Sequence, residues 1–543
     1  MSEILLSLHD YHQGKVTVFG EIYEMEKWYQ ELKLDYSLQP TKEDIMYYAF
    51  QKYGTDCFRK IRGAYNCLLQ MDDEIRIYTP PFNLMPLYYT CKEDEVYISD
   101  SFFALAKARN EKLIVNTKSL LELFSFSPCH ALHQSVYKHI YALSAGYVLI
   151  YKQHKIKIEK WYDIPVYDIK DSYEDCVQKV KSLVKDSIHA LKDGVNASFL
   201  SGGLDSSVIV AECASPSFHT YSLDYEENSL HFQANDFQKS IDTPFIDQMC
   251  QKYDLSHQSY TITQKELCDS LEAALWAREV PGMADIDASL YWFLSQIKAK
   301  DTVLFSGECA DEVFGGYPWF YRKEYDDCES FPFLNYQKER ILLLSKQYRH
   351  LPFSAYLQHQ YDECMSQIKQ RKENAYDQRF QKMRHLTFDY FMQTLVVRQY
   401  TMSTAHGVTI RVPFADVALM DYVYNLPAKY CCLDGNEKHI LRDAFQDILP
   451  NDIYERKKNP FPKTHHPVFA EMMAERLSAC VQENSILLQI FDKDALNALI
   501  QSKGESFQVP WFGQLMSGPQ LLAYLYTLHV WLSDDRIQLD LSC

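Results

Sequence analysis

Two short segments carry residues whose types and spacing could bind a nucleotide. The first is Ser201-Gly202-Gly203-Leu204-Asp205-Ser206-Ser207, which follows the apolar residues 197–200 and precedes the apolar residues 208–214. This pattern predicts a buried strand, a tight glycine loop and a helix that begins on Asp and Ser. The N–H groups at a helix start favour an anion, and serine hydroxyls add donors. We therefore expect a phosphate-binding loop, in which Asp205 could hold Mg²⁺.

The loop is not a Walker A motif, because the Gly-Lys-Ser/Thr ending is absent. It resembles the pyrophosphate loop of ATP pyrophosphatases, the enzymes that cleave ATP between its α- and β-phosphates. The alternative is a Gly/Ser turn that leads into a capped helix, which is common. The attached Asp205-Ser206-Ser207, between a strand and an apolar helix, favours the pyrophosphate loop.

The second segment is rich in carboxylates. Residues 302–305 predict a short strand, and Ser306-Gly307-Glu308-Cys309-Ala310-Asp311-Glu312 follows it directly. Ligands of an open parallel sheet bind at the carboxyl ends of its strands, so a phosphate loop and an acidic loop at two strand ends predict an ATP–Mg²⁺ site. A solvated acidic turn is the alternative for this segment taken alone.

Length and composition limit the class of protein. At 543 residues the chain is too long for one core, and 47% hydrophobic residues suffice for two or three domains. The net charge of −18 disfavours nucleic acid or an anionic membrane as the main partner. No signal peptide and no apolar run long enough to cross a bilayer is found. The 15 cysteines are scattered without a CxxC pair, which favours reduced thiols and a cytoplasmic location.

The elements that must position the two loops follow from hydrophobic periodicity. Residues 1–165 predict an α+β domain, with strands at 15–19, 63–69, 74–78 and 146–151 and a helix at 43–53. Residues 164–171 predict a linker. Residues 172–543 predict a second domain, which opens with a helix at 172–193 and continues with alternating strands (219–223, 302–305) and helices (244–252, 290–298). This alternation indicates a parallel sheet with crossover helices. The chain beyond residue 335 predicts mostly helix, with a buried helix at 521–532.

Further motifs, read together with the two loops, resemble the asparagine synthetase family. The acidic segment through Tyr317 resembles that family's Ser-Gly-Glu-Gly-Ala-Asp-Glu-Φ-Phe-Gly-Gly-Tyr, and the pyrophosphate loop is also the family's loop. Residues 407–416 resemble its Gly-Leu-Glu-Val-Arg-Val-Pro-Phe-Leu-Asp, residues 437–442 its Lys-Leu-Leu-Arg helix, and residues 449–458 its Leu-Pro…Arg-Gln-Lys. The resemblance covers roughly residues 196–535 in order. It implies an adenine-nucleotide α-hydrolase-like fold for this domain, and a truncated glutaminase-like domain of the Ntn type before it.

The resemblance implies a reaction and a set of site residues. A substrate carboxylate attacks the α-phosphorus of ATP, and an amine or ammonia then displaces AMP to form an amide. Asp205 and Asp311 match the family's Mg²⁺ ligands, Lys458 matches a lysine that stabilises charge on pyrophosphate, and Glu308 could deprotonate the amine or order its loop. The catalytic candidates are therefore Glu308, Asp311 and Lys458. The nucleotide-binding candidates are Leu200, Ser201, Gly202, Gly203, Asp205, Ser206, Ser207, Ser306 and Gly307.

Some residues depart from the family pattern or invite another interpretation. Cys309 stands where the family usually has Gly, and Thr409 where it usually has Glu, so the acceptor need not be aspartate. Glu308 is typical of asparagine synthetases, whereas β-lactam-forming relatives use a Tyr–Glu pair. His465-His466 could suggest a metal site, but adjacent histidines rarely chelate one ion, and we expect a loop there.

The N-terminal domain resembles a glutaminase that lacks its functional residues. Glutamine-dependent relatives begin Met-Cys and use that Cys as the nucleophile, whereas this sequence reads Met1-Ser2 and its first cysteine is Cys57. Phe19 stands at the position of an oxyanion-donating Asn, and Lys42 at that of an Asp that grips the amino group of glutamine. The family's upstream His-Arg-Gly-Pro and Arg-Arg-Leu-Ser segments are missing. We expect a structural domain without glutaminase activity.

Three functions remain open on the sequence. The first is an ATP- and Mg²⁺-dependent amide ligase that takes ammonia, a separate amine, or an amine on the substrate itself, as lasso-peptide cyclases and β-lactam or carbapenam synthetases do. The second is a nucleotide-binding pseudoenzyme, and the third is a tRNA-modifying or thiolating pyrophosphate-loop enzyme. A small-molecule or peptide carboxylate is the expected substrate, and a homodimer or a partner biosynthetic protein is possible; neither nucleic acid nor a membrane is expected as a partner.

Overall fold

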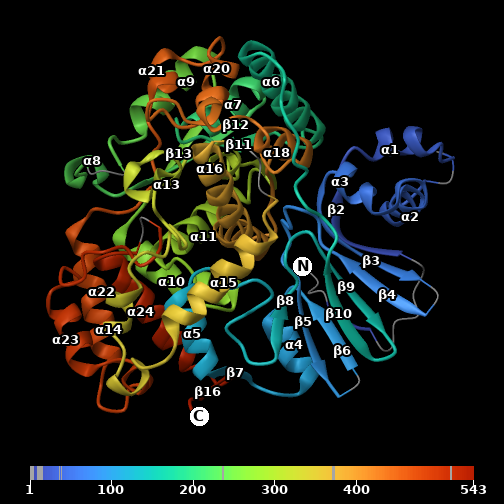
Figure 1. The fold of residues 1–543 in the computed structure, drawn as a ribbon. Coiled ribbons are helices and arrows are strands. Elements are labelled where there is room, and N and C mark those ends of the chain that lie inside the picture. The colour runs from blue at the N-terminus through green and yellow to red at the C-terminus, as the bar shows by residue number, and fades with distance from the viewer. Residues whose placement is uncertain are drawn as a thin grey trace.

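The computed structural model describes residues 5–8, 16–35, 37, 39–71, 73–93, 95–234, 238–369, 374–513 and 516–542. The chain forms an N-terminal part with antiparallel sheets and a larger part built on a parallel sheet (Figure 1). The expected class, an α+β domain followed by an α/β domain, is confirmed. The prediction at Met1-Ser2 lies outside the described residues, and the boundaries 1–165 and 172–543 stay a prediction. Among the described residues, no helix has the length and apolar character that crossing a membrane requires.

Two antiparallel sheets lie face to face in the N-terminal part. Their strands are β1 (Leu5–Ser7), β2 (Val16–Ile22), β3 (Gly63–Met71), β4 (Glu74–Tyr78), β5 (Tyr88–Lys92), β6 (Glu95–Ser99), β8 (Ile140–Ala142), β9 (Tyr147–Lys152) and β10 (Lys155–Lys160). The strand orders are β10-β9-β4-β3-β2 and β1-β6-β5-β8. Leu68, Ile77 and Leu149 of the first sheet meet Tyr89 and Ile98 of the second in one buried cluster. The four expected strands are all present as β2, β3, β4 and β9, and β1, β5, β6, β8 and β10 add to them.

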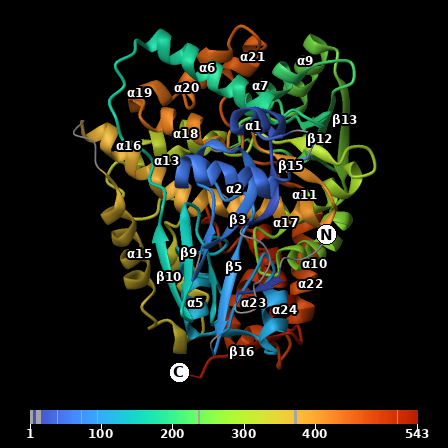
Figure 2. The same ribbon diagram turned by 90° about the vertical axis from the view of Figure 1, so that its right-hand side faces the viewer.

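Three helices cover the outer face of the five-stranded sheet: α1 (Met25–Leu32), α2 (Lys42–Tyr53) and α3 (Cys57–Lys60) (Figure 2). Trp28, Met46 and Phe58 of these helices pack against strand residues in a second buried cluster. A reciprocal cap begins α2, because the Thr41 hydroxyl accepts the Asp44 N–H (3.2 Å) and the Asp44 carboxylate accepts the Thr41 N–H (2.8 Å). The expected helix at 43–53 is therefore confirmed.

The N-terminal and C-terminal ends of the chain share one core. Helices α4 (Phe102–Arg109) and α5 (Thr117–Ser125) flank β7 (Leu113–Asn116), which pairs in parallel with β16 (Ile537–Asp540). Figure 1 shows the two strands next to each other at the end of the molecule where the chain terminates. Leu120 and Phe124 belong to the same buried cluster as Leu521 and Trp531. Neither strand was predicted, since four residues are too few to show a period.

The larger part is organised around a parallel sheet. It contains β11 (Ala197–Phe199), β12 (His219–Tyr225), β13 (Ser256–Ile262), β14 (Val303–Phe305) and β15 (Thr409–Arg411), in the order β13-β12-β11-β14-β15. Every neighbouring pair is parallel. The chain adds β12 and β13 on one side of β11 and then returns to place β14 on the other side. The switch point of the sheet, where ligands of such folds bind, therefore lies between β11 and β14.

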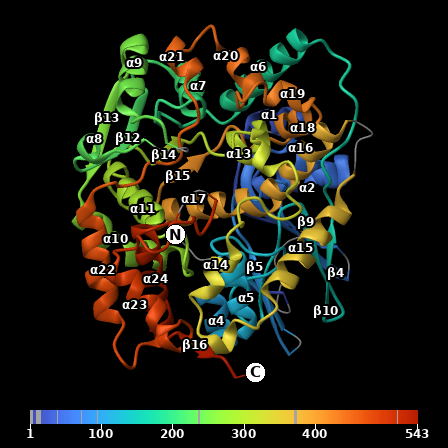
Figure 3. The same cartoon turned by 60° about the vertical axis from the view of Figure 1, so that its left-hand side comes forward.

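Helices cover both faces of this sheet (Figures 1 and 3). On one face lie α6 (Tyr173–Ala190), α7 (Leu204–Cys213) and α9 (Thr243–Tyr253), and on the other α10 (Gln264–Arg278), α11 (Asp285–Ile297) and α17 (Gln393–Ala405). The expected helices at 172–193 and 244–252 are confirmed as α6 and α9. The helix expected at 290–298 is α11, which begins earlier, at Asp285. Its first turn contains the buried residues Asp285 and Asp287, which interrupt the apolar pattern. Residues 164–171 form neither helix nor strand, as expected of a linker.

The chain beyond residue 335 is mostly helical, as predicted, with β15 and β16 as the described exceptions. The remaining helices are α8 (Asn228–His231), α12 (Ala310–Phe314), α13 (Pro318–Tyr321), α14 (Gln337–Leu342), α15 (Phe353–Gln367), α16 (Ala375–Leu386), α18 (Val417–Tyr424), α19 (Ala428–Cys431), α20 (His439–Phe445), α21 (Asn451–Glu455), α22 (Pro467–Cys480), α23 (Lys493–Gln501) and α24 (Pro519–Leu532). A π-helical turn, η5 (Thr387–Met392), joins α16 to α17, and short 3₁₀ turns are η2 (Gly54–Asp56), η3 (Lys323–Tyr325), η4 (Lys346–Tyr348) and η6 (Ile486–Gln489). Helix α24 is buried on nearly all sides, as its apolar sequence predicts.

A buried carboxyl group lies where the two parts of the chain meet. Glu122 of α5 is 1% exposed and accepts hydrogen bonds from the Tyr356 hydroxyl of α15 and the Ala131 N–H. Burial raises the pKa of Glu122 from 4.5 to about 7, although both hydrogen bonds oppose the shift. The folded state therefore binds this proton more tightly than the unfolded chain does. Protonated Glu122 therefore contributes to stability below pH 4.5, and this contribution is lost as the pH rises through 7.

We predict that Glu122→Gln stabilises the fold above neutral pH, because glutamine keeps the group uncharged. The pKa shift corresponds to about 3 kcal/mol of ionisation cost. Thermal melting at pH 5 and at pH 8 measures the effect as the difference in Tm between variant and parent. This difference should become more positive at pH 8, and a difference that does not change with pH contradicts the prediction.

Candidate active site

The phosphate loop joins β11 to α7 at the switch point. Within it the Ser201 N–H donates to the Ser206 hydroxyl (3.2 Å), and the Gly203 N–H donates to the Ser201 hydroxyl (3.3 Å). Helix α7 begins after Gly203 without a side-chain cap. Its first N–H groups are therefore left for a ligand, and the helix dipole favours an anion there.

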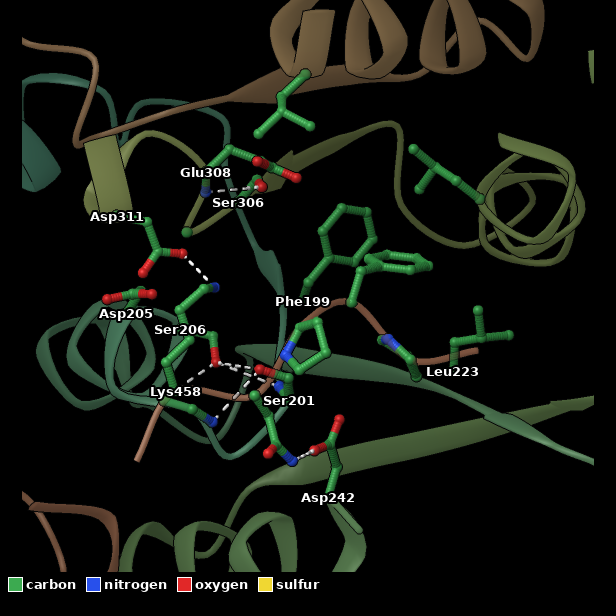
Figure 4. A pocket seen from close by; sticks show the side chains of 18 of the residues that line it. Phe199, Ser201, Asp205, Ser206, Leu223, Asp242, Ser306, Glu308, Asp311 and Lys458 are labelled. Atoms are coloured by element: carbon green, nitrogen blue, oxygen red, sulfur yellow. Dashed lines mark hydrogen bonds and ion pairs between the residues drawn. The ribbon is translucent and has the colours of Figure 1, made fainter. Parts of the chain in front are cut away.

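The acidic loop follows β14, the strand next to β11, so the two loops touch. Gly307 makes this contact possible: a Cβ atom there would lie 3.0 Å from the Asp205 Cβ and 3.1 Å from the Ser206 nitrogen. Gly316 leaves room for the Asp311 carboxylate, since a Cβ at this position would lie 1.9 Å from its Oδ1. The glycines thus bring the two predicted metal-ligating carboxylates, Asp205 and Asp311, to one place (Figure 4).

A lysine that the sequence analysis did not select holds these two carboxylates together. The Lys438 ammonium lies 2.7 Å from Asp205 Oδ2 and 2.9 Å from Asp311 Oδ1. Lys438 precedes α20, adopts a left-handed backbone conformation (φ 55°) and is 2% exposed. The ion pairs therefore form away from bulk water, where charge interactions are strong.

A second lysine, Lys458, adds another positive charge to Asp311. The Lys458 ammonium lies 2.5 Å from Asp311 Oδ2, and the backbone N–H of Lys458 donates to Glu437 Oε1 (2.9 Å). Burial raises the pKa of Asp311, but Lys438 and Lys458 outweigh burial and lower it to about 2. For Asp205 burial prevails over the attraction of Lys438, so its pKa is raised. Asp311 is therefore ionised throughout the physiological range.

Glu308, the candidate proton acceptor, is held by an arginine from another helix. Its Oε1 lies 2.6 Å from Nη2 of Arg398 on α17, and its N–H donates to the Ser306 hydroxyl (3.3 Å). Arg398 is 3% exposed and lies over the Phe461 ring at 5.2 Å. The carboxylate is therefore fixed in direction while it lines the cavity.

One cavity brings most of the predicted residues together (Figure 4). Its lining includes Leu200, Ser201, Gly203, Asp205, Ser206, Ser306, Gly307, Glu308, Asp311 and Lys458. Two predicted residues are not part of the lining. Gly202 lies at the back of the turn with φ 63°, and Ser207 is fully buried behind the loop. Their contribution to a nucleotide site would be through the shape of the loop.

A second ion pair that sequence reasoning missed supports the phosphate loop from below. Arg456 lies 2.6 Å from Asp242, and its Nη1 donates to the Ser201 carbonyl (3.0 Å). Both charged residues line the cavity. The motif at 449–458 contained Arg456, but only the fold places it beneath a loop more than two hundred residues away.

The two departures from the expected pattern have different structural settings. Cys309 is the residue before α12 and adopts φ 71°, a conformation that favours glycine. Thr409 begins β15 and pairs with Val303, and it does not line the cavity. Cys309 therefore lies within the acidic loop, whereas Thr409 lies on a neighbouring strand outside the cavity lining.

The adjacent histidines lie in the loop before α22, as predicted. His466 nevertheless joins Glu227 and His231 in a group whose ligand atoms lie within 4.8 Å of one another. Its Nδ1 accepts the Val468 N–H (3.2 Å), so the neutral ring carries its proton on Nε2, which lies 3.1 Å from Glu227 Oε2. This arrangement suits a hydrogen bond and leaves His466 no lone pair for a cation.

Comparison with known proteins agrees with this geometry. The family model described as asparagine synthase matches residues 179–533. The chain belongs to the asparagine synthase family. The family model described as a glutamine amidotransferase domain matches residues 8–162. The resemblance of the N-terminal part to a glutaminase domain and of the larger part to asparagine synthetases is therefore confirmed.

Curated relatives in this family match over much of the chain. Asparagine synthetase [glutamine-hydrolyzing] 3 of Bacillus subtilis is 34% identical over 96% of this chain and 87% of its own length. Asparagine synthetase [glutamine-hydrolyzing] 1 of the same organism is 24% identical over 86% of this chain and 78% of its own. A solved glutamine phosphoribosylpyrophosphate amidotransferase of B. subtilis shares 13% identity over 38% of this chain and 44% of its own, with a TM-score of 0.20, too low to bear on the fold.

The amidotransferase-like part places Phe19 and Lys42 on neighbouring elements. Phe19 lies on β2 opposite Asn66, and its ring packs against the core between the two sheets. The Lys42 ammonium donates to the Gly20 carbonyl at 2.7 Å. A positive charge thus occupies the turn where the family pattern has an acid.

We predict that Lys438→Met destabilises the fold, because it leaves Asp205 and Asp311 facing each other without a counter-charge. Removing one partner from a buried ion pair costs about 3–5 kcal/mol. Mg²⁺ should raise the Tm of the variant more than that of the parent, since a cation can replace the ammonium. Lys457→Met is the matched control, because Lys457 is exposed and its ammonium donates to Gly435 and Asn436, away from both carboxylates. An equal loss of Tm in both variants contradicts the role given to Lys438.

Proposed function

We propose that the protein is an ATP- and Mg²⁺-dependent ligase that joins a carboxylic acid to an amine or to ammonia and releases AMP and pyrophosphate. The observation that carries the proposal is the contact of the phosphate loop with the acidic loop at the switch point, with Lys438 between Asp205 and Asp311. Membership of the asparagine synthase family supports the same chemistry. The intact carboxylates and lysines argue against a nucleotide-binding pseudoenzyme.

In the first step an oxygen of the substrate carboxylate attacks the α-phosphorus, and the bond to the pyrophosphate oxygen breaks. The N–H groups at the start of α7 and the hydroxyls of Ser201 and Ser206 bind the departing phosphates. Lys458 and Lys438 balance the charge that builds up on pyrophosphate. Asp205 and Asp311 would hold Mg²⁺, because carboxylate oxygens suit a hard cation, and this ion would neutralise phosphate charge.

In the second step the amine attacks the acyl carbon, the C–N bond forms, and the C–O bond to AMP breaks. Glu308 accepts the proton that the amine loses. Arg398 fixes the direction of the Glu308 carboxylate through the 2.6 Å ion pair. The adenine ring fits the apolar end of the cavity formed by Phe199, Leu223 and Phe293, on the β12 side of the phosphate loop.

We also infer that the amidotransferase-like part takes no ammonia from glutamine. The Lys42 ammonium would repel the amino group of glutamine, and Phe19 cannot donate a hydrogen bond to an oxyanion. Its two sheets enclose buried apolar clusters, which supports a structural role. The nitrogen then comes from free ammonia, a separate amine or an amine on the substrate itself.

We predict carboxylate-dependent exchange of labelled pyrophosphate into ATP, which reports the first step alone. Asp311→Ala should lower this exchange by about a hundredfold or more, as expected for the loss of a charge that organises phosphoryl transfer. Glu324→Ala is the control, because Glu324 is exposed and pairs only loosely with Arg322 (3.7 Å). Unchanged exchange in Asp311→Ala shows that the metal site is elsewhere. ATP binding without exchange for any acid would favour the pseudoenzyme.

We predict that the purified protein releases no glutamate from labelled glutamine, with or without ATP. Ammonium or an amine, but not glutamine, should support AMP formation once the right acid is present. The readout is glutamate and AMP measured in the same reaction. Steady glutamate release would overturn the assignment of Lys42 and Phe19 as inactivating residues.

A further inference from the structure

The cavity has a second apolar region, lined by other residues than the adenine side. Tyr317, Trp319, Phe391, Leu395 and Phe512 line it, and we call it the aromatic chamber. The rings support one another: Tyr317 stacks on Trp319 with centroids 4.5 Å apart, and Phe391 stacks on Phe512 at 5.0 Å. The Trp319 N–H donates to the Thr387 hydroxyl (3.1 Å), so the indole presents an apolar surface. The chamber is therefore a fixed apolar surface.

The chamber opens directly onto the reacting groups. Tyr317 follows the acidic loop, and its ring lies 5.3 Å from the Lys458 ammonium. Leu395 lies on α17, one helical turn before Arg398, the partner of Glu308. If the proposed function holds, ATP lies along the phosphate loop with its adenine against Phe199, Leu223 and Phe293. The chamber is then the part of the cavity from which an acid reaches the α-phosphorus.

The charges around the cavity are already paired with one another. Among the described lining residues the cationic side chains are Arg398, Arg456 and Lys458. Their partners are Glu308, Asp242 and Asp311, respectively, at 2.6, 2.6 and 2.5 Å. A second carboxylate on the substrate would have to displace one of these buried partners, and breaking such a pair is costly.

We propose that the substrate acid is a monocarboxylic acid with an apolar group of aromatic size, which the aromatic chamber binds. This inference rests on the proposed function and names its substrate class. The carboxylate reaches the phosphate and acidic loops while the apolar group lies against Trp319, Phe391 and Phe512. A dicarboxylic amino acid such as aspartate fits poorly, because it would place its second charge against these rings.

Pyrophosphate exchange with matched acids tests the proposal on the full-length protein. The pairs are 3-phenylpropanoate against succinate and phenylalanine against aspartate, each at equal concentration with ATP and Mg²⁺. The expected result is exchange with at least one aromatic acid at a kcat/KM about tenfold or more above that of its dicarboxylic partner. If aspartate or succinate supports exchange and neither aromatic acid does, the proposed substrate class is wrong, but the proposed ligase activity stands. Exchange with none of the four acids overturns the substrate class, and absence of exchange in a wider panel of acids would defeat the ligase as well.

A variant that fills the chamber tests its position. Leu395→Trp should raise the KM for the active acid about tenfold or more, because one large side chain takes the space of the apolar group. The KM for ATP should stay within about twofold, since the adenine end is untouched. Leu342→Trp is the matched control, because Leu342 is exposed and does not line the cavity, and it should leave both KM values at the parental level. Leu395→Phe, which adds less volume, should raise the KM for the acid in the same direction if the tryptophan variant folds poorly. An unchanged KM for the acid in a folded Leu395→Trp variant, or an equal rise in the KM for ATP, overturns the chamber as the acid site.

Discussion

The ammonium group of Lys438 between two carboxylates is the interaction on which the site depends. Asp205 comes from the start of α7, Asp311 from the start of α12 and Lys438 from the residue before α20, so three segments meet at one charge. Two buried carboxylates in contact would repel each other without it. The lysine therefore lets the two acidic segments lie in contact inside the fold.

The two loops could be predicted from local sequence, whereas the charged residues that pair with them could be identified only from the tertiary structure. The phosphate loop and the acidic loop could be predicted because each combines glycines, a strand before it and polar side chains within a few residues. Lys438 stood in a motif that was noticed, but its side-chain role depends on a carboxylate 233 positions away. Arg398 looked like any charged residue of an amphipathic helix. Charge pairing across the fold leaves no local pattern, so these residues could be found only in the structure.

The N-terminal part shows that a framework can be kept while its polar positions change. The apolar residues between the two sheets and beneath α1 to α3 form continuous clusters. Thr41 still caps α2 through Asp44, while the next residue, Lys42, turns its charge to a backbone carbonyl. Packing selects apolar residues at framework positions regardless of the reaction. The strands and the helix of this part were therefore predictable from the apolar pattern alone.

The pairing of β7 with β16 has a consequence for synthesis of the chain. Residues 113–116 have their parallel partner at residues 537–540, and the helices around them share a core with Leu521 and Trp531. During translation the N-terminal sheets can form early, but this strand waits for residues made on the order of tens of seconds later. The nascent protein therefore exposes an apolar strand edge until residues 537–540 leave the ribosome. A chaperone that shields this edge would raise the yield of folded protein, and truncation near residue 537 would harm both halves together.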